Sequence, residues 1–203
     1  ELIDQGLERD NKDLVGRSWP ILKRSAKRIA NCVEDMLAFS KAREPLLEPC
    51  NLRAVIEEVT QTFYALLVCR QVDLAVDVPD FPEPVVADPR GLFRCLLNLV
   101  ANAADAVPAT GGRVRVTARA RGDGIEMAVA DNGPGVPPEL RTRIFEPFFS
   151  TKGTRGTGLG LAVAKKIIEE HGGSVTVGDS DEGGALFTLF LPRHEYKGWV
   201  RGG

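Results

Sequence analysis

Two short boxes and a glycine-rich stretch hold the residues of this sequence that are best suited to chemistry. The first box covers residues 98–105, the second begins about thirty residues later at 131–135, and the glycine-rich stretch covers 156–161. They supply, in that order, side-chain amides, a carboxylate and backbone N–H groups able to face phosphates. Each is a weak signal alone, but together they predict one pocket for Mg²⁺ and ATP.

The first box falls on a helix expected over residues 90–107. Asn98 and Asn102 are four residues apart and share a face of that helix, and Asp105 follows three residues later. Mg²⁺ takes few protein ligands beside substrate phosphates, so one asparagine carbonyl oxygen can serve as its ligand. The alternative is an interior asparagine whose hydrogen bonds are satisfied within the protein.

The second box starts at Asp131, the end of an expected strand. Gly133 and Gly135 allow the backbone to approach a flat ring closely, while the carboxylate can accept a hydrogen bond from an exocyclic amine. Such a site prefers adenine to guanine. Taken alone, the same five residues make a good turn and nothing more.

The glycine-rich stretch lies directly before an expected helix, whose N–H groups and positive end can hold phosphates. Lys152 adds a positive charge just upstream. Phe145, Phe148 and Phe149 stand in a segment with little regular pattern, which suits a mobile lid over the nucleotide. Packing of these phenylalanines in the core is the equal alternative.

Periodicity predicts the elements that must position these boxes. Asn51 can cap a helix with an apolar face from Leu52 to Leu67, and residues 113–121 and 125–129 alternate as a hairpin with one buried face. The remaining expected elements are strands at 72–78, 85–87, 174–177 and 185–191 and a helix at 159–170. We expect an α+β layer in which helices cover one face of a mixed sheet.

The N-terminal segment has a coiled-coil pattern, with apolar residues spaced alternately by four and three. Asp10 or Asn11 can cap this helix, and residues 2–7 resemble the tail of a preceding antiparallel helix. Pro20 predicts a kink or a late start at Ser18. Pro45 ends the helix and marks the domain boundary. The seam consists of Val15, Trp19, Leu22, Ala26, Ile29, Val33 and Met36.

Composition limits the function classes. The chain has 203 residues, 43% hydrophobic and 27% charged, which is enough for a buried core, and a net charge of −2 argues against a nucleic-acid binder. The sequence contains no apolar run of transmembrane length, although an anchor upstream is compatible with it. The four cysteines form no CxxC pair, so neither a zinc site nor a disulfide framework is expected, and a reducing cytoplasmic location fits.

The boxes resemble those of bacterial sensor histidine kinases. Residues 98–105, 131–135, 145–152 and 156–161 are similar to the asparagine, first glycine, phenylalanine and second glycine boxes of that family. The match covers about 46–192. The preceding helical segment, including residues 28–41, resembles the second helix of the family's dimerisation and phosphotransfer hairpin.

The resemblance implies a Bergerat-type α/β sandwich preceded by a truncated antiparallel helical hairpin, with ATP and Mg²⁺ as ligands. Asn102 would hold the metal, Asp131 would read adenine, and Asn98, Lys152 and the glycine loop would face the phosphates. The full nucleotide-binding set that it implies is Asn98, Asn102, Asp105, Ala106, Asp131, Gly133, Gly135, Val136, Phe145, Lys152, Gly156, Thr157, Gly158, Leu159, Gly160, Leu161 and Thr188.

The resemblance also implies an ATP-dependent protein-histidine kinase. Family members pass the γ-phosphoryl group to a histidine on the hairpin's first helix and then to an aspartate of a response-regulator receiver domain. The implied partners are a second copy, through the hairpin, and that receiver domain. The expected division is a partial hairpin at 1–44, the ATP-binding domain at 45–193 and a tail at 194–203.

Two departures from the family pattern stand out. The chain holds only His171 and His194, and neither lies where a phosphoacceptor is expected. His171 can instead satisfy carbonyls at a helix C-terminus. We therefore expect the acceptor and its acidic base upstream of residue 1, so that this chain alone does not autophosphorylate. Ala185 stands where the family often has a hydroxyl residue, and Thr188 can still reach the pocket.

Two other classes remain open from the sequence alone. One is an ATPase or protein-serine kinase that shares the pocket, and the other is a catalytically silent dimeric scaffold. The heptad segment favours the histidine kinase, because standalone serine kinases of this type lack such a hairpin. The scaffold is disfavoured because Asn102, Asp131 and the glycines are intact.

Overall fold

The chain folds into two compact units, residues 1–41 and 42–203. The computed structural model describes residue 4 and residues 11–40, 44–81, 85–152 and 156–195. The helix tail expected at 2–7, apart from residue 4, and tail residues 196–203 lie outside the described part of the chain. The proposed boundary at residues 44/45 stays a prediction.

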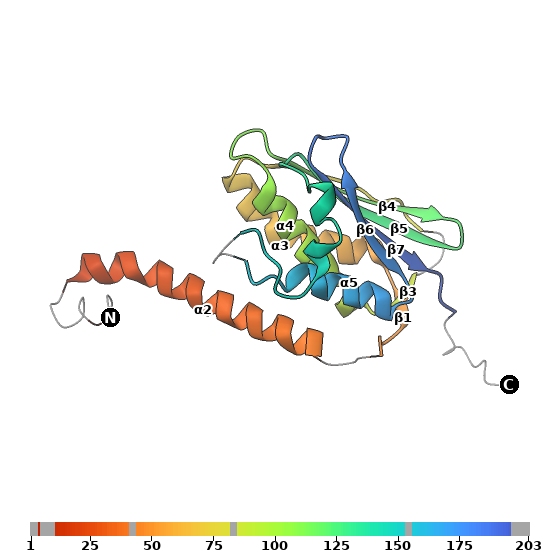
Figure 1. The fold of residues 1–203 in the computed structure, drawn as a ribbon, viewed down its shortest axis with the longest axis horizontal. Helices are drawn as coiled ribbons and strands as arrows, with labels where there is room; N and C mark the ends of the chain where they lie inside the picture. The colour runs from red at the N-terminus through yellow and green to blue at the C-terminus, as the bar shows by residue number, and fades with distance from the viewer. Residues whose placement is uncertain (1–3, 5–10, 41–43, 82–84, 153–155, 196–203) are drawn as a thin grey trace. The chain divides into compact units, whose positions relative to one another are not determined.

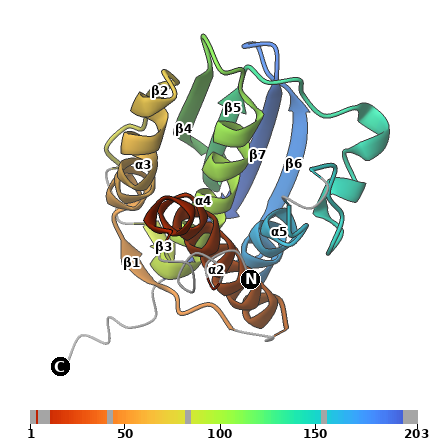
Figure 2. The ribbon, with the colours of Figure 1, turned by 90° about the vertical axis from the view of Figure 1, so that its left-hand side faces the viewer.

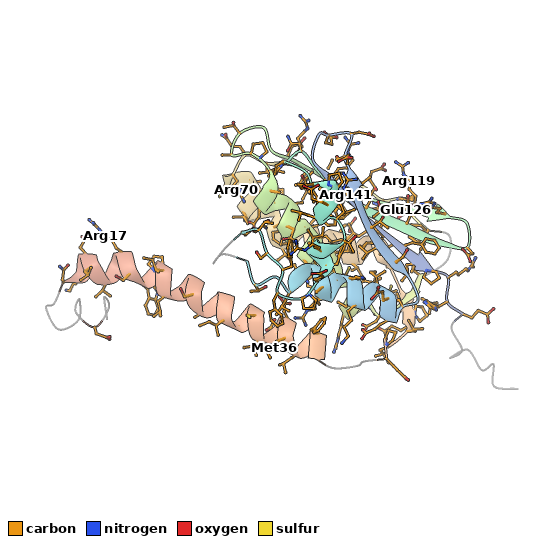
Figure 3. All side chains as sticks on the ribbon, in the orientation of Figure 1. Arg17, Met36, Arg70, Arg119, Glu126 and Arg141 are labelled. Carbon is orange, nitrogen blue, oxygen red and sulfur yellow. The ribbon has the colours of Figure 1, made fainter. Side chains whose placement is uncertain are left out.

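Helix α2 (Lys12–Ser40) forms the first unit. The Asn11 side chain caps it, because its Oδ1 accepts a hydrogen bond from the Leu14 N–H at 3.0 Å. The expected cap at Asn11 is thus confirmed. Most of the coiled-coil seam is exposed, as Figure 3 shows for Met36. The exposed large side chains of the seam are Trp19, Leu22, Ile29, Val33 and Met36.

Pro20 lies inside α2 and does not delay its start. The expectation of a start at Ser18 is therefore wrong. Proline removes one backbone donor from a helix interior. The helix nevertheless continues through Pro20 over all of its 29 residues, so this loss does not end it.

The second unit is built on a five-stranded mixed sheet (Figure 1), in which the strands follow the order β2-β4-β5-β7-β6 (Figure 2). β2 and β4 are parallel, and the other neighbours are antiparallel. A separate two-stranded ladder pairs β1 (Glu48–Cys50) with β3 (Val85–Ala87). The strands of the main sheet are β2 (Asp73–Asp77), β4 (Arg113–Arg121), β5 (Gly124–Asp131), β6 (Ser174–Asp179) and β7 (Ala185–Pro192).

Helices α3 (Leu52–Cys69), α4 (Pro89–Ala106) and α5 (Gly160–Glu170) lie over one face of this sheet (Figure 2). Buried and more exposed side chains alternate along the strands, and the buried ones pack against the helices to form the core of the unit. The expected α+β layer with helices on one face is confirmed. The inward side chains of the three central strands are Val114, Val116, Ala118, Met127, Val129, Phe187, Leu189 and Leu191.

Local signals explain where these helices begin. Asn51 Oδ1 accepts a hydrogen bond from the Ala54 N–H at 3.2 Å, as the sequence predicts. Asp88 Oδ1 accepts from the N–H groups of Arg90 and Gly91, and Pro89 occupies the first turn, where its missing donor costs nothing. Among the described residues, none of the helices has both the length and the apolarity needed to span a membrane.

Cys95 lies wholly buried between two helices, and its Sγ is 3.6 Å from the Ala164 carbonyl oxygen. Burial raises the pKa of the Cys95 thiol from 9.0 to about 12. A raised pKa in the folded state means that the thiol's contribution to stability is complete below pH 9 and is lost as the pH rises toward 12.

We therefore expect the free energy of unfolding to fall when the pH is raised from 8 to 10.5, and to fall less in Cys95→Ala. Urea unfolding at the two pH values measures both slopes. The exposed Cys69 provides the control, since Cys69→Ala should keep the parent's pH dependence. If the free energy of unfolding of Cys95→Ala fell with pH as steeply as that of the parent, the role given to this thiol would be contradicted.

Candidate functional site

The two asparagines of α4 face different neighbours. Asn98 Nδ2 donates to the carbonyl oxygen of Gly160 at 3.0 Å, which ties the middle of α4 to the first turn of α5. Gly160 is close to the same side chain, because a Cβ built there would lie 3.4 Å from Asn98 Cγ. Asn98 thus fixes the start of the helix that follows the glycine-rich stretch.

Asn102, one turn later, accepts a hydrogen bond from the ammonium group of Lys152. The distance from Lys152 Nζ to Asn102 Oδ1 is 3.2 Å, and the same nitrogen lies 3.2 Å from Asp105 Oδ2. An amide oxygen that already faces a cation suits a hard metal ion chemically. The donor set therefore fits the expectation of Mg²⁺ at Asn102.

Asp131 is almost completely buried, with 2% of its surface exposed. Its Oδ1 accepts hydrogen bonds from the N–H groups of Gly133, at 2.8 Å, and Ala185, at 3.2 Å. Both contacts use the same oxygen. Within the described residues, Oδ2 accepts no hydrogen bond and is left as an acceptor for a ligand.

Gly133 brings the Asp131 box against the end of α4. A Cβ built on Gly133 would lie 2.8 Å from the Ala106 carbonyl oxygen and 2.9 Å from Asp131 Oδ1. No larger residue fits without a shift of the backbone. Gly135 has a φ of 73°, a conformation that glycine adopts readily. Val136 follows it, and its carbonyl oxygen accepts from Arg141 Nε at 3.1 Å.

Gly184 completes this end of the site and is absent from the sequence-based set. A Cβ on Gly184 would lie 2.3 Å from Asp131 Oδ1 and 2.5 Å from the Gly133 nitrogen. The only sequence feature that pointed to Gly184 was the pair Gly183-Gly184 directly before the last strand. The pair reads as an ordinary turn until the register places it beside Asp131.

Thr188 does not share the face of the sheet that carries Asp131. In β7 the buried residues alternate with half-buried ones, and Thr188 lies between Phe187 and Leu189, which both point to the helices. The expectation that Thr188 reaches the pocket is a poor fit to this register. Ala185, where the family often has a hydroxyl group, instead contributes its backbone N–H to Asp131.

The segment between the two glycine boxes contains the short helices η1 (Pro138–Leu140) and η2 (Arg143–Phe145). Arg141, labelled in Figure 3, pairs with Asp179 at 2.5 Å and so ties the segment to β6. Phe145 packs edge-on against Phe187, with ring centroids 6.3 Å apart. For Phe145, the structure supports the core-packing alternative.

Phe148 behaves differently from Phe145. It is 69% exposed and has a φ of 67°, which is uncommon for a residue other than glycine. Its N–H donates to the Gly158 carbonyl oxygen at 2.9 Å. Gly158 itself has a φ of 67°, and a Cβ on it would lie 2.4 Å from the Phe148 carbonyl carbon. The segment is therefore in direct backbone contact with the second glycine box.

The second glycine box runs into α5. The Leu159 N–H donates to Thr157 Oγ1 at 3.3 Å, and the Val163 N–H donates to the Leu159 carbonyl oxygen at 2.8 Å. Leu159 is buried, whereas Leu161 is half-buried. Gly156 lies against Ser150, because a Cβ on it would be 2.3 Å from Ser150 Oγ.

Both histidines are engaged in holding the fold. His171 is 2% exposed; its Nδ1 lies 2.7 Å from the Ile167 carbonyl oxygen, and its Nε2 accepts from the Asp88 N–H at 3.0 Å. The expectation that His171 satisfies a carbonyl at a helix C-terminus is confirmed. His194 Nε2 lies 2.8 Å from the His171 carbonyl oxygen.

Residues 87–195 match the family model of the histidine kinase-, DNA gyrase B- and HSP90-like ATPases. The chain is 36% identical over 172 residues to the sensor histidine kinase ZraS of Escherichia coli O157:H7, covering 85% of this chain and 37% of that relative. It thus spans little more than a third of the length of this relative.

The chain is also similar to solved structures of histidine kinases. Full-length ShkA in complex with AMPPNP is 32% identical, with a TM-score of 0.77, over 89% of this chain and 39% of ShkA. The histidine kinase ThkA in complex with the response regulator TrrA is 28% identical, with a TM-score of 0.75, over 95% of this chain and 57% of that chain.

Proposed function

The chain belongs to the family of histidine kinase-, DNA gyrase B- and HSP90-like ATPases, and from that premise we propose that it is the Mg²⁺-ATP-binding core of a two-component sensor histidine kinase. The observation that carries the proposal is the buried carboxylate of Asp131. One of its oxygens is fixed by two backbone N–H groups, and the other is left to accept a hydrogen bond from the exocyclic amine of adenine.

Helix α4 links the two ends of the proposed nucleotide site. Ala106 lies against Gly133 at the adenine end, and Asn102 and Asn98 lie one and two turns earlier on the same helix. Eight residues of helix advance by about 12 Å, a length that suits a nucleotide with its phosphates directed toward Lys152 and the second glycine box. A bound Mg²⁺ would be held by Asn102 and would neutralise phosphate charge.

The remaining residues serve binding and positioning rather than covalent chemistry. Lys152 and the backbone around Gly158 would orient the γ-phosphoryl group for in-line transfer. In that transfer the bond between the γ-phosphorus and the bridging oxygen of ADP breaks, and a bond to an imidazole nitrogen forms. Asp131 and Gly133 would hold the adenine end still during this step.

We infer that the acceptor histidine is not one of the two in this chain. His171 is buried, and its Nε2, the nitrogen able to attack, already accepts from the Asp88 N–H. His194 is engaged with the His171 carbonyl oxygen. The acceptor would therefore come from a part of the kinase beyond these 203 residues.

We further propose that the phosphoryl group then passes to an aspartate of a response-regulator receiver domain. The complex of ThkA with its response regulator, which covers 95% of this chain, supports this partner class. The exposed apolar seam of α2 supports a second copy of the chain as the other partner, through a paired helical bundle.

Calorimetric titration with ADP, with and without Mg²⁺, tests the proposal directly. We expect binding that Mg²⁺ strengthens by about tenfold, the size of one additional metal contact worth about 1.4 kcal/mol. GDP should bind much more weakly than ADP. Absence of binding at millimolar ADP, or equal binding of ADP and GDP, would count against the proposal.

Asn102→Ala should remove the dependence on Mg²⁺, because the metal loses its protein ligand. We expect its affinity for ADP to be the same with and without Mg²⁺ in the same titration. Asn51→Ala is the matched control: it removes the α3 cap, at a cost of about 1 kcal/mol in stability, but should keep the parent's response to Mg²⁺. A full Mg²⁺ response in Asn102→Ala would exclude this residue as the ligand.

A further inference from the structure

The side chain of Lys152 donates a hydrogen bond to Asn102 Oδ1, the oxygen that we propose as the ligand of Mg²⁺. The ammonium of Lys152 is shared between Asn102 and Asp105 at 3.2 Å each. These contacts join residues 50 and 47 positions apart in the chain. They tie the end of the segment between the glycine boxes to the last turns of α4.

Asp105 is a poor direct ligand for a nucleotide's phosphates, because a carboxylate and a phosphate repel each other. Its surroundings are cationic instead. Lys152 lies on its Oδ2, and Arg70 Nη1, at the end of α3 (Figure 3), lies 4.0 Å from its Oδ1. The carboxylate therefore acts on the site through the lysine that it holds.

The position of Lys152 is coupled to the glycine box by short contacts. The Lys152 N–H donates to Ser150 Oγ at 3.1 Å, and Ser150 lies directly against Gly156. Two residues earlier, the Phe148 N–H donates to Gly158. A change in the contacts of Lys152 is therefore expected to shift the backbone of the second glycine box, which is expected to hold phosphates.

We propose that Asp105 is a positioning residue that holds the Lys152 ammonium on Asn102, and that a Mg²⁺–polyphosphate must displace it. The inference rests on the proposed function. Two cations compete for one amide oxygen, and the phosphates offer the displaced ammonium a new anion. Residues 148–152 thereby exchange an anchor on α4 for an anchor on the nucleotide.

The first test compares Mg²⁺-ADP affinity in two backgrounds by calorimetry. Asp105→Asn should tighten binding about two- to fivefold, the range expected when an exposed ion pair no longer has to be broken. In a Lys152→Met background the same substitution should have no effect. If simple repulsion between Asp105 and phosphate were the cause, the gain would persist without Lys152, and the inference would be overturned.

The second test uses no nucleotide. Asp105→Asn should speed hydrogen exchange at the amides of Phe148 and Lys152, because their segment loses its anchor, whereas Asp105→Glu should keep most of the protection. Glu169→Gln is the matched control, since it removes a similarly exposed carboxylate from an ion pair on α5. Unchanged exchange in Asp105→Asn would overturn the anchor.

The two tests separate the failure of this inference from the failure of the proposed function. A parent chain that binds no ADP, while Asp105→Asn still speeds exchange, would refute the nucleotide site and with it the displacement by Mg²⁺–polyphosphate. A parent that binds Mg²⁺-ADP, with neither a tighter Asp105→Asn variant nor faster exchange, would refute only the role of Asp105.

Discussion

Asp131→Asn should weaken ADP binding by about 100-fold and leave the fold intact. Asparagine has the same shape, so its Oδ1 can still accept from the N–H groups of Gly133 and Ala185. The other oxygen becomes an NH₂ donor that faces the amine of adenine. A lost hydrogen bond to a charged group is worth about 1.5–3 kcal/mol, or roughly 10- to 150-fold in affinity.

Calorimetry with ADP and IDP gives this experiment an internal control. Hypoxanthine presents an oxygen where adenine presents the amine, so Asp131→Asn should lose its preference for ADP over IDP. Asp80→Asn, which removes a highly exposed carboxylate paired with Arg53, should bind ADP like the parent. An Asp131→Asn variant with the parent's affinity for ADP would remove the observation on which the proposed function rests.

The longer helices and the strands of the main sheet were predictable because each carries a local signal, whereas the three-residue strand β1 and the short helices η1 and η2 were not predicted. Asn51 caps α3, and the alternation from residue 113 to 121 gives β4 its buried face. Such signals depend on neighbours within one or two turns of the chain. Ala120 continues the same alternation but is exposed, because coverage by the helices is a property of the packed layer and not of the strand.

The N-terminal helix shows how a local signal can mislead. Read by itself, Pro20 predicts a kink or a late start at Ser18, yet α2 starts at Lys12 and runs through Pro20 to Ser40. The cap at Asn11 and the helical turns on both sides of Pro20 outweigh one missing hydrogen bond. Propensity at one position is a weak guide when a long helix surrounds it.

The residues of the candidate site could be named from the sequence, and their role in nucleotide binding stays a prediction, but their contacts could not be predicted. Asp131, Gly133 and Asn102 follow from motifs, whereas the position of Gly184 on Asp131 depends on the register of β7 against β5. The same register turns Thr188 to the other face. The meeting of Lys152 with Asp105 spans 47 residues and has no local signal in the sequence.

Gly184→Ala should abolish ADP binding and destabilise the protein by about 3 kcal/mol, the upper end of the usual cost of overpacking. The added methyl group would stand 2.3 Å from Asp131 Oδ1 and 2.5 Å from both the Asp131 carbonyl oxygen and the Gly133 nitrogen. The last two of these are backbone atoms, so the methyl group cannot be accommodated by moving a flexible side chain alone. Urea unfolding and calorimetry measure the two effects.

Gly178→Ala is the matched control on the neighbouring strand β6, because a Cβ there meets no atom within 4 Å. It should keep ADP binding and should not lower the free energy of unfolding by more than a few tenths of a kcal/mol. The comparison separates the loss of a glycine from the loss of the space around Asp131. If Gly184→Ala bound ADP as the parent does, the close packing of Gly184 on Asp131 would not be required for the site, and the carboxylate would have to be positioned by its hydrogen bonds alone.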